Sequence, residues 1–98
     1  MSRGCARFGD RTLGTCAIHG SGIGGTIVTA SPDKIVNGRG CARIGDIVLA
    51  DCGHTSKIIT GSPTTLVNGR LCARLSDRTD GSPYRATIIT ASGDTYLT

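Results

Sequence analysis

Large aromatic side chains are nearly absent from this 98-residue sequence, which has no Trp, one Phe and two Tyr against fifteen Gly. The length favours one domain, and a domain this short buries only a limited core. Small scaffolds of this kind are usually held together by a disulfide, a metal or a partner surface. The sequence therefore predicts a single domain over residues 1–98 that depends on one of these three supports.

Signals for export and for membrane insertion are also lacking. The first residues, Met-Ser-Arg-Gly-Cys, include no apolar run of the kind found in signal peptides. No stretch approaches the length of a membrane-spanning helix. We therefore expect synthesis in a reducing cytosol, where the five Cys are not expected to form structural disulfides. An odd number of Cys also cannot pair completely.

The positive charge is not concentrated in one segment. The net charge is +4, and the eleven Lys and Arg are scattered along the chain without an aromatic platform. Nucleic-acid-binding proteins usually combine clustered basic residues with aromatic rings that stack on bases. We expect no nucleic-acid partner.

What the sequence does contain is an internal repeat of about thirty residues. A motif centred on Cys-Ala-Arg occurs at residues 4–10, 40–46 and 71–77. A second motif, a β-branched run followed by Ser-Pro and Asn-Gly-Arg, occurs at residues 26–39 and 57–70, with a shortened copy at 87–93. Matches this long indicate three units related by internal duplication.

Each unit is predicted to form short β-strands. Residues 27–28 and 58–59 are β-branched runs that lead into Ser-Pro turns. The Asn-Gly pairs at 37–38 and 68–69 follow apolar residues, and Asn-Gly is the strongest short-range hairpin signal because both central positions of a type I′ turn need positive φ. No segment shows a sustained period of 3.6 residues. The predicted fold class is all-β, with short strands and long turns.

An Arg followed three residues later by an Asp recurs in every copy, as the pairs Arg7/Asp10, Arg43/Asp46 and Arg74/Asp77. A catalytic interpretation would require three active sites created by duplication. Pairs of this type are common scaffolding, so we expect them to fix turns and strand ends instead.

Two Cys and two His occupy related loops of the first two units. Cys16 is followed by His19, and Cys52 is followed by His54; these are the two His of the chain. Residues i and i+2 of an extended segment point to one face, and a Cys-x₂-His turn can likewise present both ligands to one ion. Two Cys and two His match the ligand inventory of a closed, tetrahedral, structural zinc site, although the donor set also admits iron.

A metal at this position is an interpretation with a competitor. The same residues would also be explained by a Cys16–Cys52 disulfide or by free thiols. The corresponding loop of the third unit, residues 78–86, contains neither Cys nor His, so a metal site would join two units out of three. A bound ion would supply folding free energy that the thin core lacks.

The remaining three Cys are equivalent to one another: Cys5, Cys41 and Cys72 each stand two residues before the repeated Arg. Three equivalent thiols near a threefold axis could themselves bind a metal. Because free Cys packs like a small hydrophobic residue, we expect these three to be core residues, so that replacing all of them by Ala leaves the metal stoichiometry unchanged.

With these motifs the chain resembles the PAAR-repeat family, which is named after a Pro-Ala-Ala-Arg tetrapeptide followed by x-Gly-Asp, with Asn-Gly upstream. Here the tetrapeptide reads Gly-Cys-Ala-Arg twice and Leu-Cys-Ala-Arg once, whereas the segment Gly61 to Arg70 fits the family pattern closely. The resemblance implies a small cone of short strands and hairpins in three pseudo-threefold units. It also implies a metal, generally zinc, held near the vertex by His and Cys. The usual ligand set is three His and one Cys, whereas this chain offers two of each.

The resemblance further implies a function, a location and partners. Such proteins are sharp tips that cap the trimeric β-helical central spike of a contractile injection machine, either a phage tail or a type VI secretion system, and help to pierce the target envelope. We therefore expect synthesis in the bacterial cytoplasm, assembly of one copy per trimer at the spike tip, and transient contact with the target membrane. An adaptor that links a separate effector to the spike is the main alternative.

An enzymatic role is not expected. A metal-dependent hydrolase needs an open coordination position and a general base, and no His remains once the ligands are assigned. A small metal hydrolase is therefore the weakest alternative.

The partner face is predicted from the need to cover the unpaired strand edges at the end of a trimeric β-helix. Ile27, Ile58 and Ile88 occupy matching places in the three units and are the candidates for this contact. The same three residues would also suit the core.

Overall fold

The computed structural model describes residues 3–81, 83–93 and 95–97. Over these residues the chain is all-β, as predicted, and none of its described segments forms a helix that could span a membrane. The strands in chain order are β1 (Arg3–Gly4), β2 (Arg11–Cys16), β3 (Gly20–Ile27), β4 (Ile35–Val36), β5 (Arg39–Gly40), β6 (Ile47–Ala50), β7 (Thr55–Ile58), β8 (Leu66–Val67), β9 (Arg70–Leu71), β10 (Arg78–Asp80), β11 (Tyr84–Ile88) and β12 (Tyr96–Leu97).

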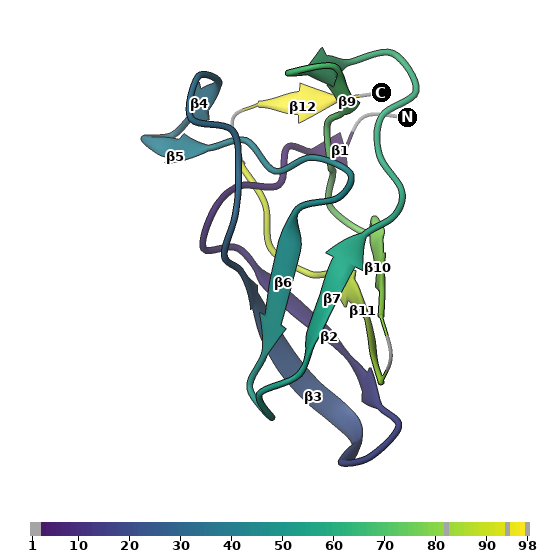
Figure 1. Cartoon of the computed structure of the whole chain (residues 1–98). Helices are drawn as coiled ribbons and strands as arrows, with labels where there is room; N and C mark the ends of the chain where they lie inside the picture. Colours follow the sequence, from purple (N-terminus) through teal and green to yellow (C-terminus); the bar gives the residue numbers. More distant parts are fainter. Residues whose placement is uncertain (1–2, 82, 94, 98) are drawn as a thin grey trace.

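Six strands close into a small antiparallel barrel in the order β10-β11-β2-β3-β6-β7. The barrel consists of three hairpins, β2–β3, β6–β7 and β10–β11, so each repeat contributes one hairpin. The hairpin turns lie toward the lower, narrower end of the molecule in Figure 1. This arrangement gives the molecule a small, cone-like shape, with overall extents of 34 × 26 × 22 Å.

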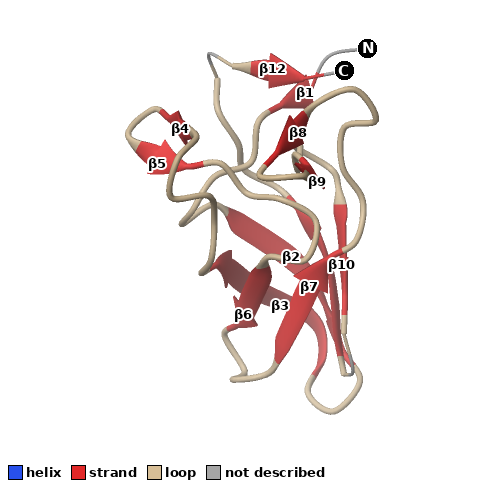
Figure 2. Ribbon diagram, turned by 45° about the horizontal axis from the view of Figure 1, so that its top comes forward, coloured by secondary structure: helices blue, strands red, loops and turns tan. Residues whose placement is uncertain are grey.

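Three two-stranded pairs form the opposite, broader end, which we call the base (Figures 1 and 2). They are β4–β5, β8–β9 and β1–β12, and they share one register. The first two are hairpins, and the third joins the two ends of the described chain, since Gly4 pairs with Tyr96. The base therefore has threefold pseudo-symmetry because the N-terminal and C-terminal segments complete the third pair.

The Asn-Gly turns of the base adopt the predicted conformation. Asn37 has a φ of 53° and Gly38 a φ of 77°, and Asn68 and Gly69 have φ values of 54° and 77°. Positive φ at both central positions is the signature of a type I′ turn, whose twist matches that of the flanking strands. The sequence signal at these two sites is confirmed.

A closed ring of backbone hydrogen bonds joins the three repeats between the base and the barrel. The Ala6 amide donates to the Ala73 carbonyl over 3.0 Å, the Ala42 amide donates to the Ala6 carbonyl over 2.9 Å, and the Ala73 amide donates to the Ala42 carbonyl over 2.9 Å. All three Ala side chains are fully buried. A side chain larger than Ala has little room here, which explains why this position of the repeat is Ala in every copy.

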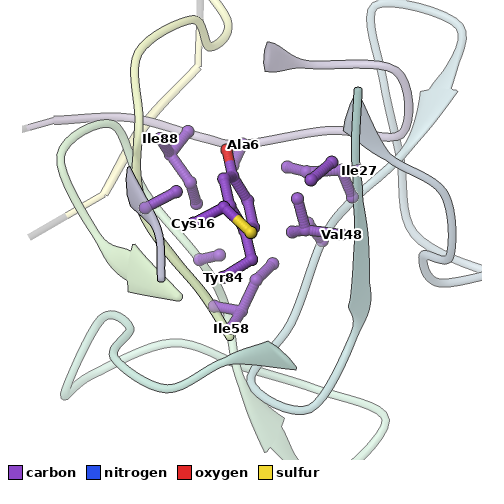
Figure 3. Packing of buried hydrophobic residues seen from close by; sticks show 11 residues of the cluster. Ala6, Cys16, Ile27, Val48, Ile58, Tyr84 and Ile88 are labelled. Carbon is purple, nitrogen blue, oxygen red and sulfur yellow. The ribbon is translucent and has the colours of Figure 1, made fainter. Parts of the chain in front are cut away.

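The barrel core is a small cluster of buried side chains that includes one aromatic residue (Figure 3). Tyr84 is fully buried, and its hydroxyl lies 3.0 Å from the Thr12 hydroxyl and donates to the Ile23 carbonyl over 2.9 Å. Gly25 faces this ring, because a Cβ at Gly25 would come within 2.6 Å of Thr12 Oγ1 and 3.0 Å of the Tyr84 hydroxyl. The scarcity of aromatic residues thus reflects a barrel with room for a single buried ring at this level.

The repeated Arg–Asp pairs hold the turns that leave the ring. In the second repeat, Arg43 Nε donates to Asp46 Oδ2 over 3.0 Å and Arg43 Nη2 donates to Oδ1 over 2.9 Å, while the Arg43 amide donates to Oδ2 over 2.7 Å. Thr29 donates to the same carboxylate. The first and third repeats reproduce the bidentate pair. These buried carboxylates are occupied by internal donors, which supports the structural interpretation of the motif.

Candidate metal centre

The four residues selected from the sequence meet at the narrow end of the molecule. Cys16 ends β2 and His19 lies in the turn before β3, whereas Cys52 and His54 lie in the turn between β6 and β7. One nitrogen or sulfur atom from each of the four residues lies within 4.8 Å of the others. Two hairpin turns from different repeats thus present their side chains to one small volume.

The distances suit a tetrahedral site. Cys16 Sγ lies 3.3 Å from His19 Nδ1 and 3.3 Å from His54 Nδ1, and Cys52 Sγ lies 3.6 Å from His54 Nδ1. In a tetrahedral site with Zn–S of about 2.3 Å and Zn–N of about 2.0–2.1 Å, sulfur and nitrogen lie about 3.5 Å apart. The two imidazole rings stand 5.1 Å apart, centroid to centroid. The donors are therefore already spaced as ligands around one ion.

The turn that carries Cys52 and His54 is shaped by its backbone. The Gly53 amide donates to the Ala50 carbonyl over 2.9 Å, and the Ala50 amide donates to the His54 carbonyl over 2.8 Å. Gly53 has a φ of 95°, a conformation that side-chain-bearing residues rarely adopt. The chain reversal at Gly53 lets the side chains of Cys52 and His54 point toward the same ion position.

The site has one buried ligand and a more open side. Cys16 is fully buried, Cys52 and His54 are partly buried, and His19 is exposed. Burial raises the pKa of the Cys16 thiol, but hydrogen bonds from His19, from the Ile18 and His19 amides and from Cys52 outweigh burial and lower its pKa to about 6. Cys16 is therefore poised to act as a thiolate, the form that binds metals.

The donor set can hold a metal ion. Two sulfurs and two nitrogens are the ligands that a soft or borderline cation prefers, and four protein ligands complete a tetrahedron. The corresponding turn of the third repeat supplies no Cys or His. An ion here would therefore link the first and second repeats directly and would leave the third repeat outside the site.

A second cluster lies at the level of the base. Cys5 Sγ is 3.0 Å from Cys41 Sγ and 3.5 Å from Cys72 Sγ, and all three residues are buried. Hydrogen bonds from Cys41 and Cys72 lower the pKa of Cys5 to about 4. The hydrogen bond to Cys5 raises the pKa of Cys41 to about 12, and the pKa of Cys72 is raised by its bonds to both partners. Hydrogen bonding within the cluster therefore favours the thiolate form at Cys5 over that at its two partners.

The predicted partner-contacting residues need correction. Ile27, Ile58 and Ile88 have 0%, 1% and 1% of their surface exposed, and they pack inside the barrel (Figure 3). Side chains on a strand alternate between the two faces, and these three fall on the inner face. They are core residues, so they are not available for contact with a partner.

The base instead exposes an equivalent apolar trio that the sequence analysis missed. Ile35, Leu66 and Tyr96 open β4, β8 and β12 and are 53%, 64% and 58% exposed. The next residues on β4 and β8, Val36 and Val67, are buried against the three Cys. The repeat could have revealed the first two positions, but the third was hidden because Tyr96 replaces the aliphatic residue and lies beyond the recognised part of the third copy.

These features define a pointed, pseudo-threefold β-structure with a Cys/His cluster near its tip and a broad base. The family model of the PAAR motif matches residues 19–82, which is more than half of the chain. The chain therefore belongs to the PAAR motif family and is a spike-tip protein of the contractile injection systems. A search of curated proteins found no significant match.

Proposed function

We propose that this protein caps the trimeric β-helical spike of a contractile injection machine, one copy per trimer, and forms the point that enters the target envelope. The single observation that carries this proposal is the threefold repetition of exposed apolar side chains on the base, at Ile35, Leu66 and Tyr96. A trimeric shaft ends in three equivalent sets of strand edges, and a cap with three equivalent contacts can cover all of them.

The orientation of the base strands supports this docking mode. The short pairs run across the long axis of the molecule (Figure 1). On β4, Val36 is buried toward the Cys cluster, so Ile35, the neighbouring residue, faces away from the interior. The same relation holds for Val67 and Leu66 on β8. The outward face of the base thus carries apolar groups at matching places and is the surface we assign to the spike.

At the other end, we propose that Cys16, His19, Cys52 and His54 bind one Zn²⁺, with iron as the competing ion. The role is structural, since four protein ligands leave no position for a substrate or an activated water. The ion would fix the β2–β3 turn and the β6–β7 turn of the tip relative to each other. A pointed β-structure that meets a membrane under force benefits from such a crosslink, because it ties the turns of two different repeats to each other.

No enzymatic activity is part of this proposal. Contact with the target membrane is transient and mechanical, and the protein is made in the bacterial cytoplasm before it is assembled on a phage tail or secretion-system spike. A separate effector joined through this protein would be additional cargo and would leave the base contact unchanged.

The test is complex formation with the trimeric spike protein of the same particle, measured by gel filtration with light scattering. The expected product contains one copy of this chain per spike trimer. The double variant Ile35→Asp/Leu66→Asp should lose binding to the spike. The control is Leu49→Asp on the barrel strand β6, where the Leu49 side chain is 43% exposed, and this variant should retain binding. Equal binding by both variants, or a stoichiometry of three copies per trimer, would contradict capping through the base.

A further inference from the structure

The Cys-Ala-Arg repeats bring three thiols to the pseudo-threefold axis, away from the tip. Cys5 Sγ lies 3.0 Å from Cys41 Sγ and 3.5 Å from Cys72 Sγ, and each pair of the three sulfurs is within 4.8 Å. The three residues are 1%, 0% and 1% exposed. These three Cys form a group that is separate from the tip cluster.

We propose that Cys5, Cys41 and Cys72 form a second metal site, a three-thiolate centre for a soft, thiophilic cation such as Cu⁺ or Zn²⁺. This inference is independent of spike binding. It replaces the sequence-based expectation that these Cys act only as small hydrophobic residues and that their removal leaves the metal content unchanged.

The geometry requires little movement. A cation in the plane of three thiolates at about 2.3 Å separates the sulfurs by about 4.0 Å. The Cys5–Cys41 and Cys5–Cys72 sulfur pairs would have to open by roughly 0.5–1 Å to reach that value, a change within the reach of small side-chain rotations. Each thiol also lies near the carbonyl of the Ala that follows it, at 3.5 Å for Cys5 and 3.7 Å for Cys41. The sulfurs thus sit over the Ala ring and face one another across the axis.

The surroundings favour a soft ion of low coordination number. Two apolar side chains, Val36 and Val67, are buried against the trio. Among the residues that the structure describes, no His or carboxylate belongs to this cluster. Thiolates without oxygen or nitrogen donors select soft cations over Mg²⁺ or Ca²⁺.

Packing alone does not explain why all three repeats carry Cys. The residues on either side of the Cys-Ala-Arg core differ between copies, with Gly4, Gly40 and Leu71 before it and Phe8, Ile44 and Leu75 after it. A buried aliphatic or Ala side chain would satisfy the packing as well as a thiol does. Cys in every copy, with the sulfurs converging, is the pattern expected of a shared ligand set.

The second site also has a structural consequence that the tip cluster lacks. The tip cluster joins the first and second repeats, while the third repeat contributes no ligand there. Cys72 belongs to the third repeat, so an ion at the base would connect all three units. The two ions would then stiffen opposite ends of the cone.

The experiment is metal analysis of the full chain, purified without oxygen from cells supplied with zinc in one arm and with copper in the other. Three proteins are compared: the wild type, the base variant C5A/C41A/C72A and the tip variant C52A/H54A. Because the thiols are buried, the ion is expected to enter during folding, so loading takes place during expression. Circular dichroism verifies the fold of each variant.

In at least one arm, the wild type should hold one more thiophilic ion per chain than the base variant. X-ray absorption should give a higher average number of sulfur ligands per metal ion in the wild type than in the base variant, whose expected shell is two sulfurs and two nitrogens. This comparison does not require the tip variant to fold. If folded, the tip variant should retain one ion with sulfur ligands alone. Equal metal content in the wild type and the base variant in both arms would overturn the proposal. A Cys5–Cys41 disulfide in the anaerobically purified chain, detected by mass spectrometry, would overturn it as well.

Discussion

Cys16 and His54 are 38 positions apart in the sequence, yet Cys16 Sγ and His54 Nδ1 lie 3.3 Å apart at the tip. Cys16 ends a strand of the first repeat, and His54 belongs to a turn of the second. Strands β3 and β6, which pair directly, bring the two turns together. The contact therefore depends on the pairing of the first and second hairpins, and a metal held there reports on the tertiary fold as well as on the local sequence.

Removal of one tip ligand should release the ion. In His54→Ala we expect zinc content to fall below one half of the tip-site value and Tm to decrease by at least about 10 °C, because a loss of 1 kcal/mol corresponds to about 4–8 °C in a domain of this size. Elemental analysis and a thermal melt measure the two effects. Lys57→Ala, an exposed change three residues further on in β7, serves as the control and should alter neither quantity.

The buried Arg–Asp pairs should contribute more to stability than the exposed pairs. Asp46→Asn leaves Arg43, whose side chain is 9% exposed, without its charged partner, and breaking a buried pair in this way costs about 3–5 kcal/mol. Denaturant unfolding of both proteins measures the difference.

The matched control for this pair is Asp51→Asn. Asp51 pairs with Arg11 over 2.8 Å, but its side chain is 60% exposed. Water and salt screen such a pair, so the control should unfold close to the wild-type midpoint. An equal loss of stability in the two variants would show that burial does not govern these interactions.

Tyr84 should couple stability to alkaline pH. Burial raises its pKa above the ordinary value of 10.0, although the hydrogen bond to Thr12 opposes this shift. A raised pKa means that the folded chain keeps the proton when the unfolded chain loses it. The stabilising contribution is therefore complete below pH 10 and is lost as pH rises through the pKa of the folded state.

The measurement uses the Tyr96→Phe variant, in which Tyr84 is the remaining tyrosine. Tyrosinate absorbance should appear above pH 10 and together with the loss of the circular dichroism signal. A tyrosinate that forms near pH 10 in a chain that is still folded would contradict the buried environment.

Close contact between strands makes Gly14 the least replaceable glycine of the barrel. A Cβ at this position of β2 would collide with the Arg85 carbonyl and with Ala86 on the paired strand β11. Gly14→Ala should therefore lower Tm by more than 10 °C or prevent folding, since the clash is with backbone that cannot rotate away. Gly93→Ala meets no atom within 4 Å and should fold normally. Soluble yield and thermal melts compare the two variants.

The sequence was sufficient for the fold class, the hairpin turns and the grouping of the tip residues. Asn37-Gly38 specifies its own turn through local backbone preferences, so no tertiary information was needed. The repeat placed Cys16 and Cys52 in equivalent loops, and equivalence around an axis brought them together. These predictions rest on local chemistry and on internal symmetry, and both can be recognised in a single sequence.

Closure of the barrel, and which face of each short strand is buried, could not be predicted from the sequence in this way. The pairing of β2 with β11 joins the first repeat to the last, and no local sequence pattern predicts a pairing partner so far away in the chain. The sequence leaves Ile27 and its equivalents as candidates for either the partner face or the core, because a short β-branched run does not reveal which of its faces is inside. Tyr96 was missed because the pair β1–β12 forms between the two ends of the described chain.

The most direct test of the tip site is X-ray absorption at the zinc edge on the C5A/C41A/C72A variant, which isolates this site from the base cluster. Our account predicts one zinc per chain, surrounded by two sulfurs at about 2.3 Å and two nitrogens at about 2.0–2.1 Å. A folded variant that contains no metal, or one whose metal has a shell of oxygen ligands, would contradict it.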